Sequence, residues 1–384
     1  MPQEIKDLSL LRAEIDRLDK EIVALFAARM QVSAGVAAYK RKTGMAVTDT
    51  GREKALLDRV AALSPTGISA YTRTLYHTIL SLSRAYQHAE LGVTGPLATL
   101  IDRAGRTTPP TLPANADVAC QGTLGAYSQK AAEKLFSHPV IHHYDKFSDV
   151  FRAIEAGECR YGVLPIENST AGSVTEIYDL MAKHRFYIVS ATKLPINHCL
   201  LAKKGERLAD IHEIVSHRQA LLQCGDFLGE YSHITQTSMA NTAFAAAFAA
   251  TSEKGVAAIA DKGCATLYDL QILAEDIADT KSNRTRFICI SKEPEIYKGA
   301  DKTGITMTVP HKPGALARLL ARFDALSINL TKIESRPIPE RDFEFRFYFD
   351  LQAPADSPVL VHLLTELAEE SEEFRYLGTY RETE

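Results

Sequence analysis

Two cations lie inside a helical apolar pattern near the start of the chain. Apolar residues recur every three or four positions from Leu8 onward, and Arg29 stands where this pattern requires an apolar side chain. Lys40 follows eleven residues later, about three helical turns with ~20° left over, so both cations are predicted to face the interior. Buried cations need anionic partners. Either a protein carboxylate such as Glu53 or an anionic ligand would meet this need.

Further polar groups follow short apolar runs in the middle of the chain. They lie in four segments: Gly122–Ser128, Pro165–Thr170, Ser216–Gln219 and Thr285–Phe287. Each segment also has an ordinary structural interpretation. Glycines shape turns, Asn168 can cap a helix, His217 can be an interior histidine, and threonine is common in strands. One segment alone therefore does not establish a catalytic site.

Two motifs near the carboxyl terminus are candidates for binding a small anion. Gly314–Ala317 begins a predicted helix, and Glu334–Pro337 ends a predicted strand. A glycine at a helix start lets a ligand approach backbone amides, which suit a carboxylate. The alternative is that Gly314 only turns a strand into a helix.

The elements that position the first cations are predicted to be helices. The apolar pattern indicates one helix from Leu8 to about Lys40, which would be roughly 50 Å long, whereas a domain of ~90 residues is only ~30 Å across. We therefore expect a partner chain to cover part of this helix. A capping box at Thr50–Glu53 predicts a second helix to Leu63, and Tyr71–His88 repeats the helical pattern.

The middle of the chain alternates between strand and helix patterns. Strands are expected at Val118–Gln121, Tyr161–Pro165, Phe186–Ser190, Ile214–His217 and Val256–Ala260. Helices are expected at Phe147–Glu155 and Gln219–Leu228. This alternation predicts parallel sheets, and two clusters of strands predict two α/β lobes that face a cleft.

After Pro294 the predicted order is strand, helix, strand, strand, helix, strand, which is the ferredoxin-like βαββαβ order. These elements are expected at Gly304–Val309, Gly314–Leu326, Ile328–Ser335, Phe343–Leu351, Pro358–Glu369 and Tyr376–Tyr380. The predicted division is an all-helical domain at 1–91, a glycine- and proline-punctuated linker at 92–114, a two-lobed α/β domain at 115–293 and an α+β domain at 300–384.

Composition narrows the class of function. The chain has 384 residues, of which 46% are hydrophobic and 24% charged, with a net charge of −4. These values fit a soluble multidomain protein with small-molecule partners and give no basic surplus for nucleic acid or membrane. The start lacks an export signal and the longest apolar run, Ala243–Ala250, is short, so a cytoplasmic location is expected. The six cysteines show no CxxC spacing, so neither a disulfide framework nor a metal site is expected.

The helical segment resembles the all-helical chorismate mutases along most of its length. The matching positions are Arg12, Arg29, Lys40, Asp49, Arg52, Glu53, Ser83 and Gln87. The resemblance implies a rearrangement within one molecule of chorismate, which requires confinement and a shaped field but no cofactor.

The residue types suit that reaction. Arg12 and Arg29 are expected to bind the two carboxylates, while Lys40 and Gln87 stabilise charge at the ether oxygen. Glu53 would hold the ring hydroxyl, and Asp49, Arg52 and Ser83 complete the predicted pocket. By the same resemblance Arg12 enters the pocket of a neighbouring subunit, so an interlocked homodimer or a higher homo-oligomer is expected.

Residues Asp117 to Ser291 resemble the prephenate dehydratases, on the four polar segments in the family's order. Thr123 and Arg218 depart from the family, which usually has proline at the first position and often at the second. The resemblance implies that Thr285 donates a hydrogen bond to the departing hydroxyl, helped by Arg286 or by amides. Predicted prephenate-binding residues are Ser128, Glu167, Asn168, Ser216, Gln219 and Arg286. Glu167 is the alternative acid.

The last segment resembles the amino-acid-binding ACT family, although Ala317 departs from its usual valine. The resemblance implies that L-phenylalanine binds at Gly314, Ala315, Leu316, Glu334, Ser335 and Arg336. The three resemblances together imply a bifunctional chorismate mutase and prephenate dehydratase of phenylalanine biosynthesis. Its α/β domain would be periplasmic-binding-protein-like, no cofactor would be needed, and L-phenylalanine would inhibit it. Truncation after about Glu293 is expected to leave a catalytic but phenylalanine-insensitive enzyme.

Two rival interpretations stay open from sequence. The first is a non-catalytic amino-acid sensor or binding protein whose helices serve only for dimerisation, which predicts no turnover of chorismate or prephenate. The predicted interior positions of Arg29 and Lys40 count against it. The second is a fusion of the mutase with prephenate dehydrogenase, which would need a GxGxxG dinucleotide turn. The sequence Gly122-Thr123-Leu124-Gly125 does not supply that turn.

Overall fold

The computed structural model describes residues 7–45, 47, 49–91, 95–338, 341, 343–371 and 373–384. Packing divides the chain into two units, one of Met1–Asp102 with Thr306–Arg375 and the other of Arg103–Ile305 with Tyr376–Glu384. The first unit therefore combines the helical segment with most of the C-terminal segment. The predicted domain boundaries stay predictions. The predicted linker 92–114 contains a helix, α4 (Pro96–Thr107), which its glycines and prolines did not indicate.

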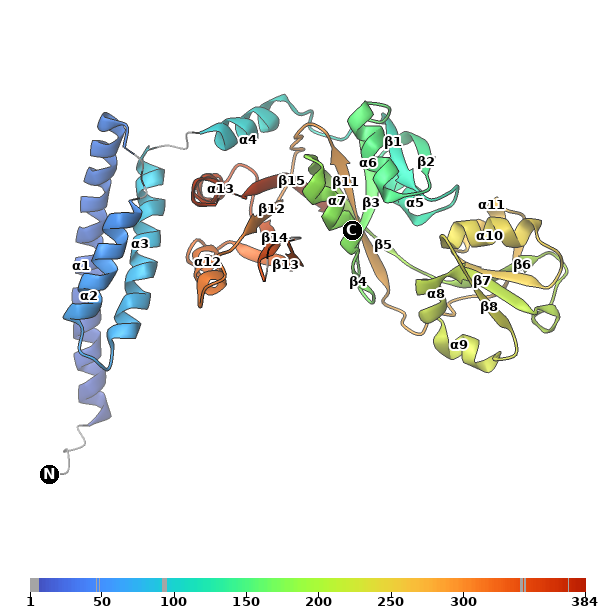
Figure 1. Cartoon of the computed structure of the whole chain (residues 1–384), viewed down its shortest axis with the longest axis horizontal. Helices are drawn as coiled ribbons and strands as arrows, with labels where there is room; N and C mark the ends of the chain where they lie inside the picture. The colour runs from blue at the N-terminus through green and yellow to red at the C-terminus, as the bar shows by residue number, and fades with distance from the viewer. Residues whose placement is uncertain are drawn as a thin grey trace. The chain divides into compact units, whose positions relative to one another are not determined.

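Three helices form the N-terminal part of the first unit: α1 (Leu8–Thr43), α2 (Thr50–Leu63) and α3 (Ser69–Leu91). They run side by side in Figure 1, where α3 contacts both other helices. Gly44 ends α1 in the left-handed conformation. Asp49 caps α2 by accepting from the backbone N–H of Arg52 at 2.9 Å. The predicted capping box placed this cap at Thr50 and is wrong by one residue.

The apolar face of α1 is exposed in a single chain. Its buried residues are Ser33 and Ala37, whereas Leu25 in the predicted apolar seam is 71% exposed. Arg29 and Lys40 are half-buried, so their predicted interior position is only partly correct. Among the described residues, α1 is the one helix long and apolar enough to cross a membrane by length and composition alone. The sequence reasoning missed this because it counted only uninterrupted apolar runs.

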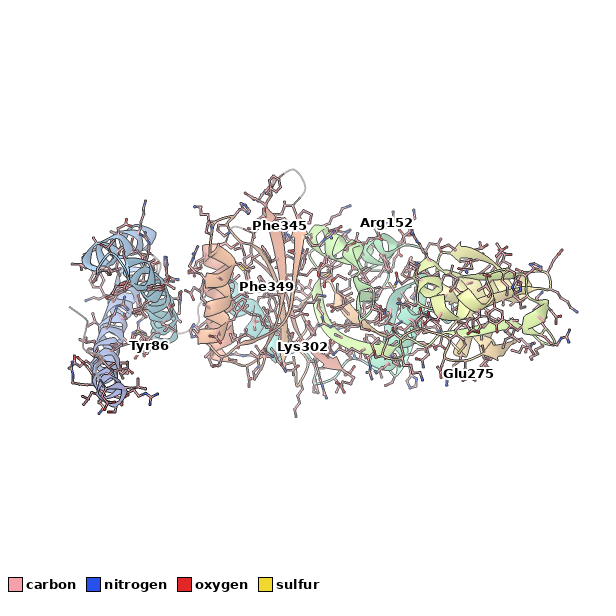
Figure 2. The ribbon with its side chains drawn as sticks, turned by 90° about the horizontal axis from the view of Figure 1, so that it is seen from below. Tyr86, Arg152, Glu275, Lys302, Phe345 and Phe349 are labelled. Carbon is pink, nitrogen blue, oxygen red and sulfur yellow. The ribbon has the colours of Figure 1, made fainter. Side chains whose placement is uncertain are left out.

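The C-terminal segment has the βαββαβ order that its sequence predicts. Its elements are β12 (Lys302–Thr308), α12 (Ala315–Ala325), β13 (Asn329–Pro337), β14 (Phe345–Gln352), α13 (Pro358–Glu370) and β15 (Arg375–Thr383). The strand order is β13-β14-β12-β15, and β13 is antiparallel to β14. Phe345 and Phe349 lie along β14 (Figure 2), and Phe349 packs edge-on against Phe323 of α12 with ring centroids 5.7 Å apart. This contact holds the helix on the sheet.

The second unit contains two α/β lobes. The strands of the first lobe are β1 (Asn115–Gln121), β2 (His138–Tyr144), β3 (Tyr161–Asn168), β4 (Gly172–Ser173), β5 (Tyr187–Pro195) and β11 (Arg284–Ser291). Its helices are α5 (Tyr127–Leu135), α6 (Phe147–Ala156) and α7 (Thr175–Lys183). Strand β1 is parallel to β2 and β3, but β11 is antiparallel to both of its neighbours, β3 and β5. The prediction of parallel sheets is therefore correct for part of the strands, and the sheets are mixed.

The second lobe has a sheet of order β10-β6-β9-β7-β8. These strands are β6 (Cys199–Lys203), β7 (Glu213–His217), β8 (Thr235–Met239), β9 (Val256–Ala260) and β10 (Leu270–Ala274). The helices are the 3-10 turn η1 (Leu208–Asp210), α8 (Arg218–Leu222), α9 (Gly225–Glu230), α10 (Thr242–Thr251) and α11 (Gly263–Leu267). The predicted helix Gln219–Leu228 is thus two short helices. Every residue of β9 is buried, and the small alanines of α10 pack against it.

The end of the chain adds a strand to the first lobe. Arg381, Glu382 and Thr383 of β15 pair in parallel with Ser190, Ala191 and Thr192 of β5. Gly378 has φ +129°, and a Cβ there would collide with the backbone of Ile188. Only glycine permits this close approach. The C-terminal strand is therefore a structural part of the α/β unit.

Candidate active sites

Helices α1 and α3 bring three of the predicted mutase residues together. Nη1 of Arg29 donates to Oγ of Ser83, and Nε2 of Gln87 donates to the carbonyl oxygen of Ser83 at 3.2 Å. Oε1 of Gln87 is buried, and within the described part of the chain it has no hydrogen-bond partner. A buried amide oxygen of this kind needs a donor from another molecule or from water. Oε1 of Gln87 is thus a buried acceptor that can bind a donor from a ligand, close to Ser83 and Arg29.

Lys40 lies beside the start of α2. Its Nζ donates to the carbonyl oxygen of Val47, and burial lowers the pKa of Lys40 below its ordinary value. The charges of Asp49 and Glu53 act in the opposite direction, whereas Arg52 adds to the lowering. The carboxylate of Asp49 is occupied in capping α2, and Arg52 is exposed. Lys40 therefore lies within the electrostatic influence of Asp49, the N-cap of α2, and of Arg52 and Glu53 in that helix.

Arg12 does not join this group within one chain. It is exposed on α1, seventeen residues before Arg29, which is roughly 25 Å along a helix. An arginine side chain cannot span that distance.

Arg84 is a charged residue at this site that the sequence reasoning missed. Its Nη1 lies 2.7 Å from both carboxylate oxygens of Glu53. Glu53 therefore does pair with a cation of the protein, as one of the two alternatives from sequence required, but this cation is Arg84 rather than Arg29. No spacing signal separated Arg84 from an ordinary helix-surface arginine.

In the α/β unit, Thr285 and Asn168 are paired across β11 and β3. Nδ2 of Asn168 donates to Oγ1 of Thr285 at 2.8 Å, and Thr285 is 8% exposed. Oδ1 of Asn168 accepts from the backbone N–H groups of Thr170 at 3.1 Å and Ala171 at 2.9 Å, which fixes the orientation of its amide. Because the threonine oxygen accepts from Asn168, its own hydrogen is available to donate to another group.

Residues of the second lobe and of the segments that connect the two lobes extend this cluster, and the sequence did not indicate them. Nδ2 of Asn283 donates to Oε1 of Gln223 at 3.0 Å, and Nε2 of Gln223 donates to Oγ1 of Thr170 at 2.7 Å. Nε2 of His198 lies 3.0 Å from the same Gln223 oxygen and must donate to it. Burial lowers the pKa of His198, which favours the neutral form of the ring, and its Nδ1 is buried without a partner among the described residues.

Several predicted prephenate-binding residues are occupied elsewhere. Oγ of Ser216 donates to the carbonyl oxygen of Ile259 at 2.6 Å, and Ser216 is fully buried. The backbone N–H of Gln219 donates to Nδ1 of His217 at 3.3 Å, which makes His217 a helix cap. Ser128 is buried in the first turn of α5. Among the described residues, no hydrogen bond joins Ser128, Ser216 or Gln219 to Thr285.

Arg286 and Glu167 lie on the other face of the sheet. They are in register with each other next to the pair of Thr285 and Asn168, and neighbouring residues of a strand point to opposite faces. Nε of Arg286 donates to Glu382, and its Nη2 donates to the hydroxyl of Tyr380 at 2.8 Å. The strand alternation directs both side chains away from the hydroxyl of Thr285, and these two hydrogen bonds hold Arg286 there.

The glycine-rich loop before α5 contacts the second lobe. The hydroxyl of Tyr268 donates to the carbonyl oxygen of Leu124 at 2.6 Å, and Lys130 forms an ion pair with Asp261. A Cβ on Gly125, which has φ +85°, would lie 2.8 Å from the Leu267 side chain. The loop therefore joins the two lobes and requires glycine at this position.

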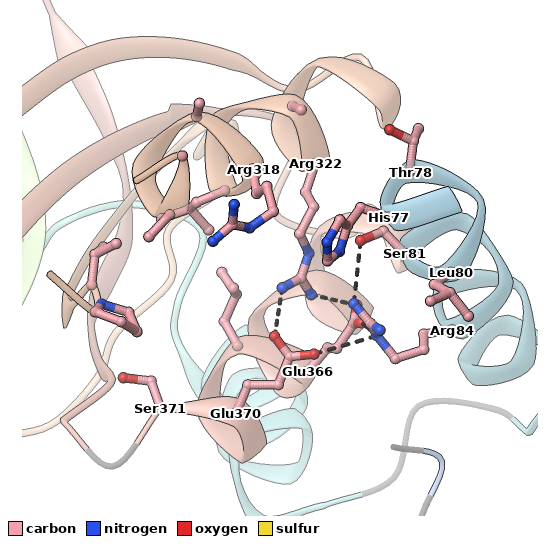
Figure 3. A pocket seen from close by; sticks show the side chains of 18 of the residues that line it. His77, Thr78, Leu80, Ser81, Arg84, Arg318, Arg322, Glu366, Glu370 and Ser371 are labelled. Atoms are coloured by element: carbon pink, nitrogen blue, oxygen red, sulfur yellow. Dashed lines mark hydrogen bonds and ion pairs between the residues drawn. The ribbon is translucent and has the colours of Figure 1, made fainter. Parts of the chain in front are cut away.

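Three of the predicted effector residues line cavities of the first unit, whereas Glu334, Ser335 and Arg336 lie on strand β13 outside the cavity linings. Leu316 lines a cavity of about 370 Å³ together with Phe345 and Phe347, and Ser335 is in register with Phe347 on the neighbouring strand. Gly314 and Ala315 line a larger cavity of about 970 Å³ (Figure 3). Gly314 has φ +74° and precedes the first residue of α12. Glu334 and Arg336 flank Ser335 on β13.

Comparisons with known proteins match the helical N-terminal segment and the α/β segment of the chain. The family model of prephenate dehydratase matches residues 118–295, and that of type II chorismate mutase matches residues 11–88. A bifunctional chorismate mutase/prephenate dehydratase of Escherichia coli (strain K12) is 31% identical over 97% of this chain and 96% of its own length. Arogenate dehydratase 2 of Petunia hybrida is 37% identical over 68% of this chain and 71% of its own length. The crystal structure of a prephenate dehydratase in complex with L-Phe from Arthrobacter aurescens is 29% identical, with a TM-score of 0.62 over 69% of this chain and 90% of that one.

Proposed function

This chain belongs to the family of bifunctional chorismate mutase/prephenate dehydratases, and on that premise we propose which residues perform each of its two reactions. The protein rearranges chorismate to prephenate and converts prephenate to phenylpyruvate, two steps of phenylalanine biosynthesis. The proposed dehydratase site depends on one observation, the hydrogen bond from Asn168 to Thr285 that leaves the threonine hydrogen free to donate.

The proposed mutase site confines chorismate between α1, α2 and α3. Arg29 binds one carboxylate, and Ser83 orients its guanidinium. Lys40 and the amide of Gln87 stabilise the ether oxygen, where negative charge grows as the carbon–oxygen bond breaks. Glu53 accepts from the ring hydroxyl, while Asp49 and Arg52 support Lys40 from the start of α2. The rearrangement needs no nucleophile and no cofactor, because bonds form and break within one molecule.

We assign the second carboxylate to Arg12 of another copy of the chain. The distance along α1 supports this assignment, since Arg12 and Arg29 of one chain cannot serve one pocket. The exposed apolar face of α1 supports it as well, because a second copy would bury those side chains. The charged residues Asp16, Arg17 and Asp19 in this helix favour a protein partner over a lipid bilayer. We therefore propose a soluble, cytoplasmic homodimer or higher homo-oligomer.

In the proposed dehydratase site, prephenate loses its ring carboxylate and its ring hydroxyl together. The carbon–carbon bond to the carboxylate breaks, its electron pair enters the ring, and the hydroxyl departs as the ring becomes aromatic. Thr285 donates a hydrogen bond to the departing oxygen, and Asn168 fixes the threonine by donating to its oxygen. The amides of Asn168, Asn283 and Gln223 hold this group between the two lobes.

We propose that the C-terminal segment is an ACT-like domain that binds L-phenylalanine and lowers dehydratase activity. Its βαββαβ order supports this, and so does the apolar cavity beside Leu316, where Phe345 and Phe347 suit an aromatic ring. The backbone amides after Gly314 suit the carboxylate of an amino acid. The similar dehydratase from Arthrobacter aurescens was solved in complex with L-Phe.

A coupled assay with the purified full chain tests these assignments. Chorismate is supplied without nicotinamide, and prephenate and phenylpyruvate are followed over time. Both products should appear in sequence, and prephenate supplied alone should give phenylpyruvate. Arogenate serves as a parallel substrate, because the similar Petunia protein is named for it. Failure to consume prephenate in a folded protein would refute the proposed dehydratase site.

A further inference from the structure

The Arg84 guanidinium joins Glu53 to two carboxylates of the C-terminal segment. Its Nη1 lies 2.7 Å from both oxygens of Glu53, and its Nε lies 2.9 Å from Oε1 of Glu366 and 3.4 Å from Oε1 of Glu370. Glu366 and Glu370 are one helical turn apart on α13, so both face the same side. Figure 3 shows Arg84 and Glu366 pointing toward each other. One side chain therefore links α2, α3 and α13 within the first unit.

The centre of the cluster is buried, whereas Glu53 and Glu370 are partly exposed. The side chain of Glu366 is 3% exposed and that of Arg84 is 12% exposed. Arg322 of α12 completes it, with Nη2 2.8 Å from Glu366 and Nη1 2.6 Å from Glu370. Burial disfavours the charged form of Arg84, but Glu370, Glu53 and Glu366 outweigh burial and raise its pKa above the ordinary value. A permanently charged, well-anchored guanidinium is therefore held against Glu53.

We propose that Arg84 is a positioning residue for the mutase reaction, held by Glu366 and Glu370 so that α13 of the C-terminal segment fixes the carboxylate of Glu53. This inference rests on the proposed role of Glu53 as acceptor for the ring hydroxyl. Arg84 uses part of the acceptor capacity of that carboxylate and leaves further lone pairs for the substrate. The mutase pocket is thus complete only when α13 packs against α3, which couples mutase activity to the C-terminal segment.

The first test neutralises Glu370, which is the more exposed of the two α13 carboxylates. Glu370→Gln is compared with Glu369→Gln, an exposed neighbour on the same helix. We expect the mutase KM for chorismate to rise roughly tenfold in Glu370→Gln, with prephenate dehydration unchanged, because the anchoring of Arg84 is weakened while Arg322 keeps Glu366 as its partner. Glu369→Gln should match the wild type. Equal mutase kinetics in both folded variants would overturn the proposal.

The second test removes Arg84 itself. Arg84→Met keeps much of the apolar stem but loses the charge, and mutase kcat/KM should fall by roughly tenfold to a hundredfold. Arg84→Lys keeps the charge and should recover part of the loss. In the Arg84→Met background Glu370→Gln should have no further effect, since its route to Glu53 is already lost. Full additivity of the two substitutions would contradict that route. If Arg84→Met does not fold, Glu370→Gln still decides the question.

A third variant separates this inference from the function on which it rests. Glu53→Gln should strongly lower mutase turnover and spare dehydration. Near-normal mutase activity in that variant would refute the role of Glu53 and the inference with it. A large loss in Glu53→Gln, combined with wild-type mutase kinetics in folded Arg84→Met and Glu370→Gln, would refute the role of Arg84 alone.

Discussion

The ion cluster around Glu382 gives a sharp prediction about the α/β unit. Glu382 on β15 forms ion pairs with Lys193, Arg286 and Lys302, and its side chain is only 6% exposed. Glu382→Gln keeps the size of the side chain but removes the only anion among these contacts. The largely buried cations of Arg286 and Lys302, together with the more exposed Lys193, would then lack the carboxylate that compensates them. We therefore expect this substitution to destabilise the α/β unit.

The pKa of Glu382 gives the size of the expected loss in folding stability. Burial raises it, but Arg286, Lys302 and Lys193 outweigh burial and lower it from 4.5 to about 2. This depression corresponds to about 3 kcal/mol of stability at neutral pH, since each pKa unit is worth about 1.4 kcal/mol. Because the folded pKa is depressed, the contribution is present above pH 4.5 and is lost as the pH falls toward 2. For a unit of this size the loss at pH 7 lowers Tm by roughly 6 to 12 °C.

The assay is thermal unfolding of full-length wild type, Glu382→Gln and the control Glu384→Gln, whose residue is exposed at the chain end. Hydrogen exchange of the β5 and β11 amides assigns the loss to the α/β unit, because more than one unit can unfold. The difference between wild type and Glu382→Gln should be largest at pH 7 and should shrink below pH 4.5. Equal Tm and equal amide protection at pH 7 would refute the reasoning.

Three further outcomes follow from the sites. Lys40→Ala should abolish mutase turnover and spare dehydration, whereas Arg41→Ala, on the exposed side of α1, should spare both activities. Because burial lowers the pKa of Lys40, its charge is lost as the pH rises, and wild-type mutase activity should fall before the pH reaches 10.5. Thr285→Val should lower dehydratase kcat by about a hundredfold or more while Thr285→Ser retains activity, and phenylpyruvate formation by folded Thr285→Val at the wild-type rate would make Thr285 structural. Calorimetry should detect L-phenylalanine binding to the wild type and weaker binding to Gly314→Val, because Gly314 has a left-handed φ that strains a β-branched residue. If the wild type does not bind L-phenylalanine, the proposed effector site is wrong.

The sequence predicted the positions of helices and strands better than it predicted which side chains share one face of them. The helical periodicity of α1 and the β-branched runs of the α/β unit are local signals, and their predicted ranges agree with the structure to within a few residues. The sequence indicates both Thr285 and Asn168 as site residues, and the structure brings them together. Arg286 was named on the same strand, but the strand period turns it to the opposite face. Gln223 reaches the cluster from the second lobe and Asn283 from the connection that precedes β11, which no local pattern could indicate.

The C-terminal strand shows why a domain boundary read from sequence misleads about truncation. Cutting after about Glu293 looked harmless because the pattern changes there and a complete βαββαβ segment follows. In the structure, Arg381–Thr383 form an outer strand on β5, and Glu382 is the anion for Arg286, the residue next to Thr285. Such a cut would remove both the strand and the anion. The expectation of an active truncated enzyme must therefore be revised, and loss of dehydratase activity on truncation would not by itself reveal regulation.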